Sequence, residues 1–265
     1  MEVHVTGFVP TLSRAVLKIK SILVSQPAPT DEKSPYIELA KKLNLKFDFR
    51  PFIQVKGVDG QDFRQERINI LDHSAIVLTS KNAVDHFFRM CKELRLTVPE
   101  NMKYFCVSES VAYYLQKYII YRKRKVFIGK QTFADLMDVI KKHKAERYLV
   151  PCSDIQQGEI PALLDKANVK YTNAVFYRTV ASDLSDIKEL KYDMLVFFSP
   201  GGIESLKKNF PKFKQGDVCI AAFGPTTAKA VVDNGFRLDL QAPLPEAPSM
   251  TGAIELFIKR QAKKK

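Results

Sequence analysis

The feature that most constrains the fold is a repeat, in which one strand–serine–helix pattern occurs twice. Ile76 to Phe87 reads IVLTSKNAVDHF and Leu195 to Leu206 reads LVFFSPGGIESL, with Ser80 and Ser199 119 residues apart. In each copy, β-branched and aromatic residues end at a serine and lead into an amphipathic helical pattern. The repeat predicts an internal duplication of an α/β unit.

Other pairs of segments recur at nearly the same offset. They are Asn44 to Val55 with Asn168 to Val180, Lys103 to Leu115 with Val218 to Val231, and Ser21 to Ala40 with Arg147 to Leu164. The copies then occupy about residues 21–144 and 147–260. This organisation predicts two lobes, one cleft and two related sets of loops facing it. Residues 1–20 have no counterpart, and we interpret them as an N-terminal extension.

Short apolar segments alternate with helical patterns, which is typical of parallel sheets covered by helices. Strands are expected at residues 22–25, 46–49, 53–55, 75–79, 103–107, 126–128, 148–151, 170–173, 175–180, 194–198, 218–223 and 238–240. Helices are expected at residues 34–43, 82–94, 110–117, 133–142, 160–167, 202–209, 226–234 and 251–263. The fold class predicted from this alternation is α/β.

The cysteines and apolar runs indicate the compartment. No apolar run reaches the roughly 18 residues of a membrane-spanning helix, and the start of the chain lacks the apolar core of a secretory signal. The four cysteines show no CxxC spacing, and Cys106 and Cys219 fall in predicted buried strands. Core thiols in a reducing compartment are therefore expected, rather than disulfides or a metal site. We expect a cytoplasmic protein that does not associate with membranes.

The charge favours an anionic partner. Forty-two Lys and Arg against 29 Asp and Glu give a net charge of +13. Such a field attracts nucleic acid, anionic lipid or a small substrate rich in carboxylates or phosphates. Neither a nucleic-acid-binding signature nor a GxxxxGK[ST] or GxGxxG phosphate motif is present, so charge alone does not choose among these partners.

Four polar turns open predicted helices at the carboxyl ends of strands. They are Thr79-Ser80, Ser108 to Ser110, Ser199 to Gly202 and Gly224 to Thr227. Each turn alone reads as an ordinary helix N-cap. Together, several helix N-termini at one edge of a sheet make a site for carboxylates or phosphates. Tyr177, in the run Ala174 to Val180, is a candidate proton donor, although a tyrosine in an extended segment is more often a core residue.

Five motifs resemble the uroporphyrinogen-III synthase family over about residues 21–260. They are TSKNAV (Thr79 to Val84), VFYRTV (Val175 to Val180), FFSPGGI (Phe197 to Ile203), GPTTAKAV (Gly224 to Val231) and PSMTGAIEL (Pro248 to Leu256). The resemblance implies two α/β lobes joined by a two-stranded connector. Lobe one would be residues 21–53 plus 181–265 and lobe two residues 54–180, with connectors at about 52–55 and 176–180.

The resemblance also implies an activity. It is the cofactor-free cyclisation of hydroxymethylbilane, a hydro-lyase reaction of tetrapyrrole and heme biosynthesis that expels water and inverts ring D. Tyr177 would donate the proton to the departing hydroxyl. The residues implied to hold the eight carboxylates are Thr79, Ser80, Ser108, Ser199, Gly201, Thr226 and Thr227. The expected state is a monomer that binds this linear tetrapyrrole and does not bind nucleic acid.

One turn departs from the family pattern. Where members often have VGxxTA, this chain reads Val107 to Ala112 (VSESVA), which places Ser108, Glu109 and Val111 at this turn. We therefore expect the Ser199 and Thr226 loops to bind substrate more closely than the Ser108 side. The departure leaves open a non-catalytic tetrapyrrole or anion sensor. A nucleic-acid-binding protein and an enzyme acting on a phosphorylated substrate also remain as alternatives.

Overall fold

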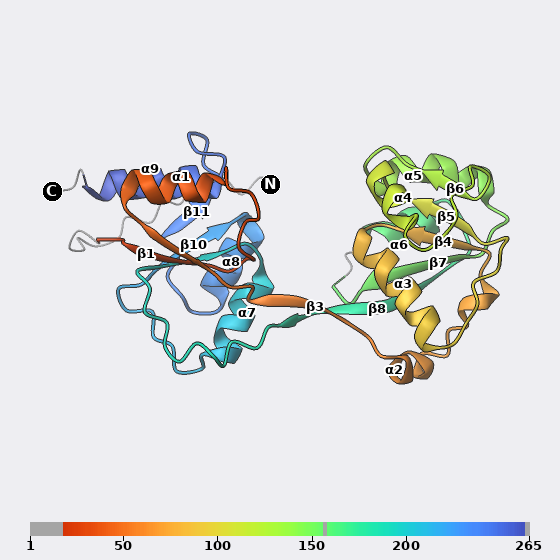
Figure 1. Cartoon of the computed structure of the whole chain (residues 1–265), viewed down its shortest axis with the longest axis horizontal. Helices are drawn as coiled ribbons and strands as arrows, with labels where there is room; N and C mark the ends of the chain where they lie inside the picture. Colours follow the sequence, from red (N-terminus) through yellow and green to blue (C-terminus); the bar gives the residue numbers. More distant parts are fainter. Residues whose placement is uncertain (1–17, 156–157, 263–265) are drawn as a thin grey trace, which may run out of the picture. The chain divides into compact units, whose positions relative to one another are not determined.

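The computed structural model describes residues 18–155 and 158–262, so most of the predicted N-terminal extension lies outside the described residues. The chain divides into two compact units (Figure 1). Unit 1 takes the described residues up to Gln54 and those from Val180 onward, and unit 2 is Val55–Thr179. Unit 1 is thus assembled from both ends of the chain, and unit 2 is inserted between its parts.

Unit 1 is a five-stranded parallel sheet between two layers of helices. Its strand order is β11-β10-β9-β1-β2, with β1 (Ser21–Val24), β2 (Lys46–Phe49), β9 (Met194–Phe197), β10 (Cys219–Phe223) and β11 (Leu240–Ala242). One face packs against α1 (Pro35–Leu43) and α9 (Met250–Ala262), and the other against α7 (Pro200–Asn209) and α8 (Pro225–Asp233).

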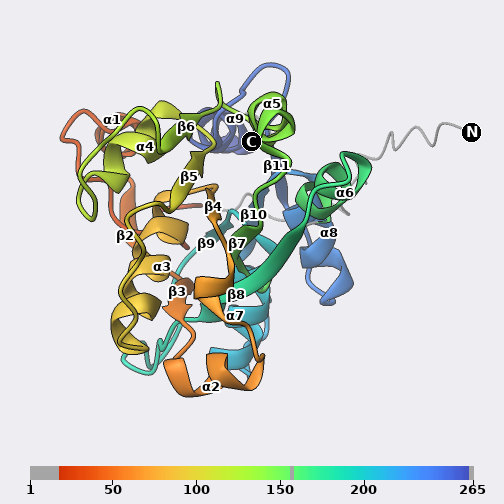
Figure 2. The same ribbon diagram turned by 90° about the vertical axis from the view of Figure 1, so that its right-hand side faces the viewer.

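Unit 2 contains a six-stranded sheet of order β3-β8-β7-β4-β5-β6. These strands are β3 (Ile53–Gly57), β4 (Ala75–Leu78), β5 (Lys103–Cys106), β6 (Val126–Ile128), β7 (Tyr148–Ser153) and β8 (Tyr171–Ala181). Helices α3 (Lys81–Glu93) and α4 (Glu109–Leu115) cover one face, and α5 (Phe133–Ile140) and α6 (Glu159–Lys166) the other (Figure 2). The short helices are α2 (Gly60–Gln65), η1 (Ile70–Asp72) and η2 (Lys141–His143).

The central strands are apolar because both of their faces are covered. In β4, Ile76 and Leu78 join the core beneath α3 and α4, while Ala75 and Val77 join the core beneath α5 and α6. This alternation follows from the two-residue period of a strand. Burial on both faces is what distinguishes such a sheet from a half-exposed one. The predicted α/β class with mostly parallel sheets is confirmed.

The two sheets share one strand order. Read from the other edge, unit 1 runs β2-β1-β9-β10-β11, and the parallel strands of unit 2 run β8-β7-β4-β5-β6. In unit 1, β1 and β2 come from the first sequence copy and β9, β10 and β11 from the second. In unit 2, β7 and β8 come from the second copy and β4, β5 and β6 from the first. This exchange of equivalent strands supports the duplication we propose. The order reverses between β1 and β9 and between β7 and β4. In open α/β sheets, ligands bind beyond the carboxyl ends of strands at such switch points.

Some element boundaries differ from the predictions. The strands expected at residues 170–173 and 175–180 are one strand, β8, which pairs with β7 through Asn173 without interruption. The strand expected at 238–240 is displaced to Leu240–Ala242. Helix α2 was not predicted, because its sequence GQDFRQ has one buried apolar side chain, Phe63, and no helical periodicity. Burial of Cys106 and Cys219 is confirmed.

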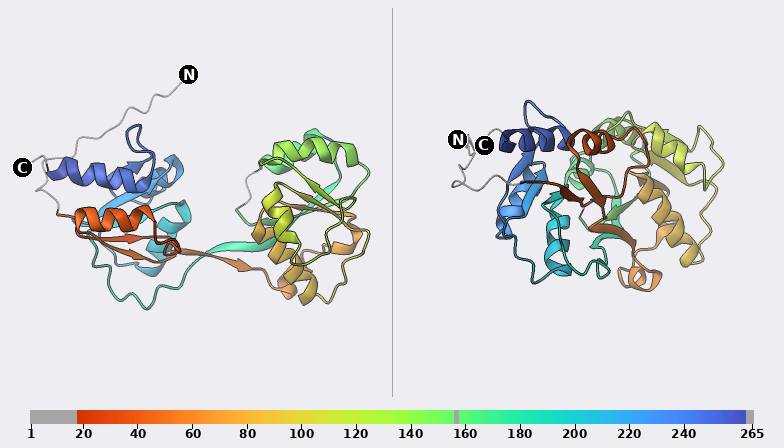
Figure 3. Two further views of the ribbon diagram at one scale, coloured as in Figure 1. Left: turned by 45° about the horizontal axis from the view of Figure 1, so that its top comes forward. Right: turned by 60° about the vertical axis from the view of Figure 1, so that its left-hand side comes forward.

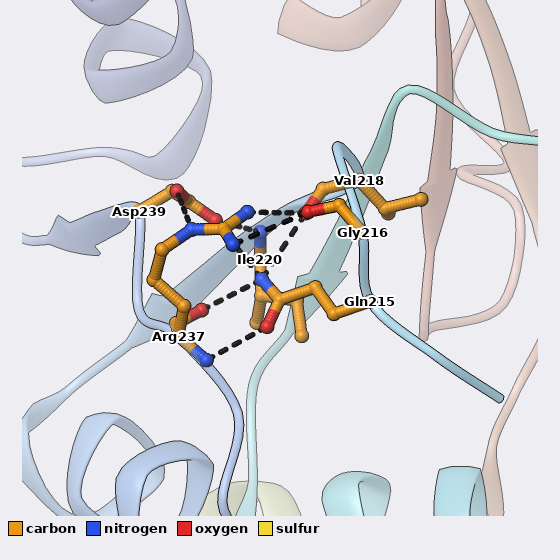
Figure 4. Close-up of polar contacts among 6 residues, drawn as sticks. All are labelled: Gln215, Gly216, Val218, Ile220, Arg237 and Asp239. Atoms are coloured by element: carbon orange, nitrogen blue, oxygen red, sulfur yellow. Dashed lines mark hydrogen bonds and ion pairs between the residues drawn. The ribbon is translucent and has the colours of Figure 1, made fainter. Parts of the chain in front are cut away.

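The fold has three further features. Within the described residues, no helix is both long and apolar enough to span a membrane. Strands β3 and β8, through which the chain passes between the units, are neighbours in their sheet (Figure 3). In unit 1, Gln215, Arg237 and Asp239 form a polar network at the amino ends of β10 and β11 (Figure 4).

Candidate functional site

Tyr177 lies on β8 where the neighbouring strand β7 ends. Its register partner is Ser153, after a shift in the pairing between Cys152 and Ser153. The backbone N–H of Asp154 donates to the Tyr177 carbonyl at 3.3 Å. The side chain is 9% exposed and belongs to the core beneath α3 and α4. Tyr177 is therefore both a core residue and a residue near the β7–β4 switch point.

Ser80 contacts the Tyr177 phenol from the start of α3. Its Oγ caps the helix by accepting from the Ala83 N–H at 3.1 Å. The Ser80 side chain also lies close enough to the phenol to lower the pKa of Tyr177. A serine hydroxyl can accept one hydrogen bond and donate another, so the cap leaves the Ser80 proton available. The structure thus brings together two of the predicted site residues, and it does so through an ordinary N-cap.

The phenol of Tyr177 is held in its protonated form. Burial raises the pKa of Tyr177, the hydrogen bond with Ser80 lowers it, and nearby Cys152 raises it, so that the net pKa lies above its ordinary value of 10.0. Burial has this effect because a phenolate loses hydration in the protein interior. At neutral pH the group is a neutral donor, as general acid catalysis requires.

His86 is the site neighbour that the sequence interpretation missed. Its imidazole stacks on the Tyr177 ring, with ring centroids 5.0 Å apart and an interplanar angle of 22°. His86 lies outside the four polar turns that the sequence singles out, and the family resemblance assigns it no role. The available sequence signal is that His86 follows Ser80 by six residues and lies within the helix predicted at residues 82–94. The partner Tyr177 is on a distant strand, so only the tertiary structure joins them.

The remaining unit 2 residues lie differently. Thr79 is half-buried after β4. Ser108 occupies the N-cap position of α4 without a side-chain cap bond, and its Oγ pairs with that of Ser110 at 3.0 Å. Val111 is buried in the core of unit 2, whereas Glu109 is exposed. Val111 therefore fills space behind the turn, and the negative charge of Glu109 faces solvent.

In unit 1, the Ser199 loop occupies the β1–β9 switch point. Ser199 precedes α7 without capping it through its side chain, and it is half-buried. A Cβ added to Gly202 would lie 3.8 Å from the hydroxyl oxygens of both Ser25 and Ser199, so these groups line one small region. Gly201, also half-buried, has Ile53 3.4 Å from the position of an added Cβ. This loop presents uncapped helix N–H groups, which suit an anion.

Thr226 and Thr227 open α8 one strand further along the sheet. Gly224 precedes them at φ 84°, a left-handed conformation that favours glycine. Thr226 is exposed, whereas Thr227 is 1% exposed. Of the two hydroxyls, solvent reaches that of Thr226. A direct contact with a ligand therefore fits Thr226 better than Thr227.

Comparison with known proteins gives consistent matches. The family model described as uroporphyrinogen-III synthase HemD matches residues 34–252. Uroporphyrinogen-III synthase of Chlorobaculum parvum is 24% identical over 261 residues, covering 91% of this chain and all of the relative. The Saccharomyces cerevisiae protein of the same name is 28% identical over 137 residues, covering 46% of this chain and 50% of the relative.

A solved structure shows the same fold. The crystal structure of uroporphyrinogen-III synthetase from Helicobacter pylori matches with a TM-score of 0.56 at 16% sequence identity. The match covers 91% of this chain and 100% of the other.

Proposed function

The chain belongs to the uroporphyrinogen-III synthase family, and from this premise we propose that it cyclises hydroxymethylbilane with Tyr177 as the proton donor. The enzyme class is a hydro-lyase of tetrapyrrole biosynthesis. The observation that supports this role for Tyr177 is its environment, a buried and protonated phenol that contacts Ser80 and His86. Units 1 and 2 would then correspond to the two lobes of the family.

The first step breaks the carbon–oxygen bond of the hydroxymethyl group. The Tyr177 hydroxyl gives its proton to the departing oxygen, which leaves as water, and the substrate becomes an azafulvene cation. The substituted carbon of ring D attacks this cation to form a carbon–carbon bond and a spiro intermediate. Fragmentation and reclosure invert ring D, and the proton released on rearomatisation restores the phenol. The net change is loss of one water.

Binding of eight carboxylates requires positive potential and hydrogen-bond donors. The net charge of +13 supplies the potential. We propose that the donors come from Thr79, Ser80 and Ser108 in unit 2 and from Ser199, Gly201, Thr226 and Thr227 in unit 1. Thr227 would contribute through its backbone N–H, because its side chain is buried. The helix starts at Ser199 and Gly224 suit this role, because neither is capped by a side chain.

The test supplies freshly made hydroxymethylbilane, oxidises the product and resolves the type III isomer from type I. The wild-type chain is expected to form type III. Tyr177→Phe keeps the ring and removes the proton, so kcat should fall by about a hundredfold or more. Tyr171→Phe is the matched control, because Tyr171 lies on the same strand and its hydroxyl bonds only the exposed Asp165. Full type III activity in Tyr177→Phe would exclude the proposed acid.

A tetrapyrrole or anion sensor is the second candidate, favoured by the turn at Ser108, Glu109 and Val111 that departs from the family pattern. It predicts that the chain binds the linear tetrapyrrole and releases only type I product at the spontaneous rate. The same isomer assay separates the two functions.

We further propose that the protein works as a cytoplasmic monomer without a cofactor and does not bind nucleic acid. Support for a reducing compartment comes from the cysteines, which are buried as core residues in the described structure. Light scattering tests the monomer, and salt-dependent retention of duplex DNA would contradict the exclusion of nucleic acid.

A further inference from the structure

We propose that His86, held by Arg89, is a positioning residue that fixes the orientation of the Tyr177 phenol. This inference rests on the proposed function and extends it to two residues outside the loops considered so far. Three contacts carry it: a ring stack, a hydrogen bond to the imidazole, and a set of bonds from one guanidinium to the backbone next to Tyr177.

The stack controls the ring of Tyr177. Helix α3 reaches the phenol twice, at the hydroxyl through Ser80 and at the ring face through His86. At a centroid separation of 5.0 Å and an angle of 22°, the imidazole lies flat against the ring. A tilt of the phenol would break this contact. Because Ser80 and His86 belong to one rigid helix, their two contacts together fix the position of the Tyr177 hydroxyl.

Arg89 sets the state of the imidazole. Its Nε donates to His86 Nδ1 at 3.2 Å, so Nδ1 is the acceptor and Nε2 carries the proton. Burial lowers the pKa of His86, the Arg89 charge lowers it further and Asp85 raises it, with a net decrease. Asp85 accepts hydrogen bonds from the hydroxyls of Tyr114 and Tyr118 at 2.8 and 2.7 Å. The imidazole is therefore neutral at pH 7, and a neutral ring stacks without introducing a charge beside the phenol.

Arg89 also fixes the backbone that carries Tyr177. Its Nη2 donates to the carbonyl of Val58 at 2.6 Å and to that of Phe176, the residue before Tyr177, at 3.2 Å. Its Nη1 pairs with Glu93 at 2.6 Å. The guanidinium passes so close to Gly57 that an added Cβ there would lie 2.7 Å from its Cζ. One side chain thus ties α3 to β8 and to the segment that follows β3.

This arrangement predicts an effect on turnover rather than on binding. A proton donor must lie within hydrogen-bond reach of the departing oxygen, and a displacement of about 1 Å reduces the rate by up to a hundredfold. His86 itself is assigned no contact with substrate. Its loss should lower kcat and leave KM nearly unchanged.

The experiment compares His86→Ala with His86→Phe in the complete chain, with hydroxymethylbilane as substrate. His86→Ala removes the ring and should lower kcat about tenfold, with KM within about twofold. His86→Phe restores a flat ring and should recover most of the lost rate. The matched control is His143→Ala. His143 is also half-buried in unit 2 and contacts Phe127 in a tilted arrangement with ring centroids 4.3 Å apart, but in the described structure it has no ring contact with Tyr177 or His86.

Two outcomes would overturn the proposal. One is a kcat for His86→Ala no lower than that of His143→Ala. The other is that His86→Ala lowers kcat by the same factor in the Tyr177→Phe variant as in the wild-type chain. A residue that acts through Tyr177 should have little effect once the phenol proton has been removed. If His86→Ala fails to fold, the kcat and KM of His86→Phe and Arg89→Lys are compared with those of His143→Ala instead. A wild-type chain that forms only type I product rejects the proposed function itself, which separates the two failures.

Discussion

At the scale of single residues, Asp193 shows how one carboxylate fastens distant parts of unit 1. It accepts hydrogen bonds from the backbone N–H groups of Lys20 and Ser21, each at 2.8 Å, and from the Ser21 hydroxyl at 2.9 Å. Burial raises the pKa of Asp193, but these three bonds and the Lys20 charge lower it, and the net pKa lies below its ordinary value of 3.8. The ionised form therefore stabilises the junction of β1 and β9.

The first stability prediction concerns Asp193→Asn. At pH 7 the substitution should lower the free energy of unfolding by about 1–2 kcal/mol, because it weakens charge-assisted hydrogen bonds. A depressed folded pKa gives stability that is fully present above the unfolded pKa and is lost as the pH falls through the folded pKa. The difference between wild type and variant should therefore shrink below about pH 4.

Urea unfolding at pH 7 and pH 3 measures this difference. Asp138→Asn is the control, since Asp138 is largely exposed and forms an ion pair with Lys141, the residue that follows α5. An effect of equal size at both pH values would contradict a role for the Asp193 charge.

At the scale of elements, a polar network fastens the short strand β11 to β10. The Gln215 Nε2 donates to the carbonyls of Val218 and Arg237 and to Asp239, at 2.9–3.1 Å (Figure 4). Its Oε1 accepts from the Arg237 N–H at 2.7 Å. Asp239 in turn binds the Arg237 guanidinium and the Ile220 N–H. These bonds compensate for a strand of three residues.

Gln215→Ala should therefore destabilise unit 1 by about 2–3 kcal/mol, because it removes four hydrogen bonds and leaves partly buried groups unpaired. Hydrogen exchange should show faster exchange at the β10–β11 ladder and unchanged protection in β4 and β5 of unit 2. The control is Lys214→Ala, because Lys214 is the exposed residue next to Gln215. This variant should change the free energy of unfolding by less than about 0.5 kcal/mol. Equal effects of the two variants would reject the network's role.

Most elements were predictable because their local signals and their tertiary environments agree. Strand β6 begins and ends with its apolar run, β2 follows the alternating pattern of residues 46–49, and α1 begins after its Ser34 cap. The prediction broke β8 at Ala174, after the polar residues Thr172 and Asn173, but the ladder to β7 continues through Ala174. For α2, the cap at Asp59 was present in the sequence, but one buried side chain gives no period.

The site was predictable only in part, for a related reason. Ser80 and Tyr177 were both named, and the structure joins them. His86 and Arg89 were not, because their contacts with Tyr177, Phe176 and Val58 cross between elements that are far apart along the chain. Local patterns identify residues at helix starts. They do not identify residues in mid-helix whose importance comes from a neighbouring strand.

At the scale of the whole molecule, the net charge of +13 should govern substrate capture. Salt shortens the range of charge interactions from about 10 Å at 0.1 M to a few ångströms at 1 M. Raising NaCl from 0.05 to 0.5 M should therefore raise KM for the octacarboxylate several-fold and change kcat by less than about twofold. Sucrose of equal osmolarity is the uncharged control. A KM that does not respond to salt would show that the overall charge does not act in binding.

The insertion of unit 2 within unit 1 also affects how the chain is made. Ser21 on β1 and its partner Asp193 are 172 residues apart in the sequence. At a synthesis rate of about 5–20 residues per second, β1 leaves the ribosome about 10–30 s before β9, its second neighbour in the sheet. Unit 2 is complete during that interval, whereas the edge of β1 that pairs with β9 has no partner. Residues 18–54 are therefore the part of the nascent chain that waits longest for its partners, and β11 (Leu240–Ala242) is the strand that completes its sheet.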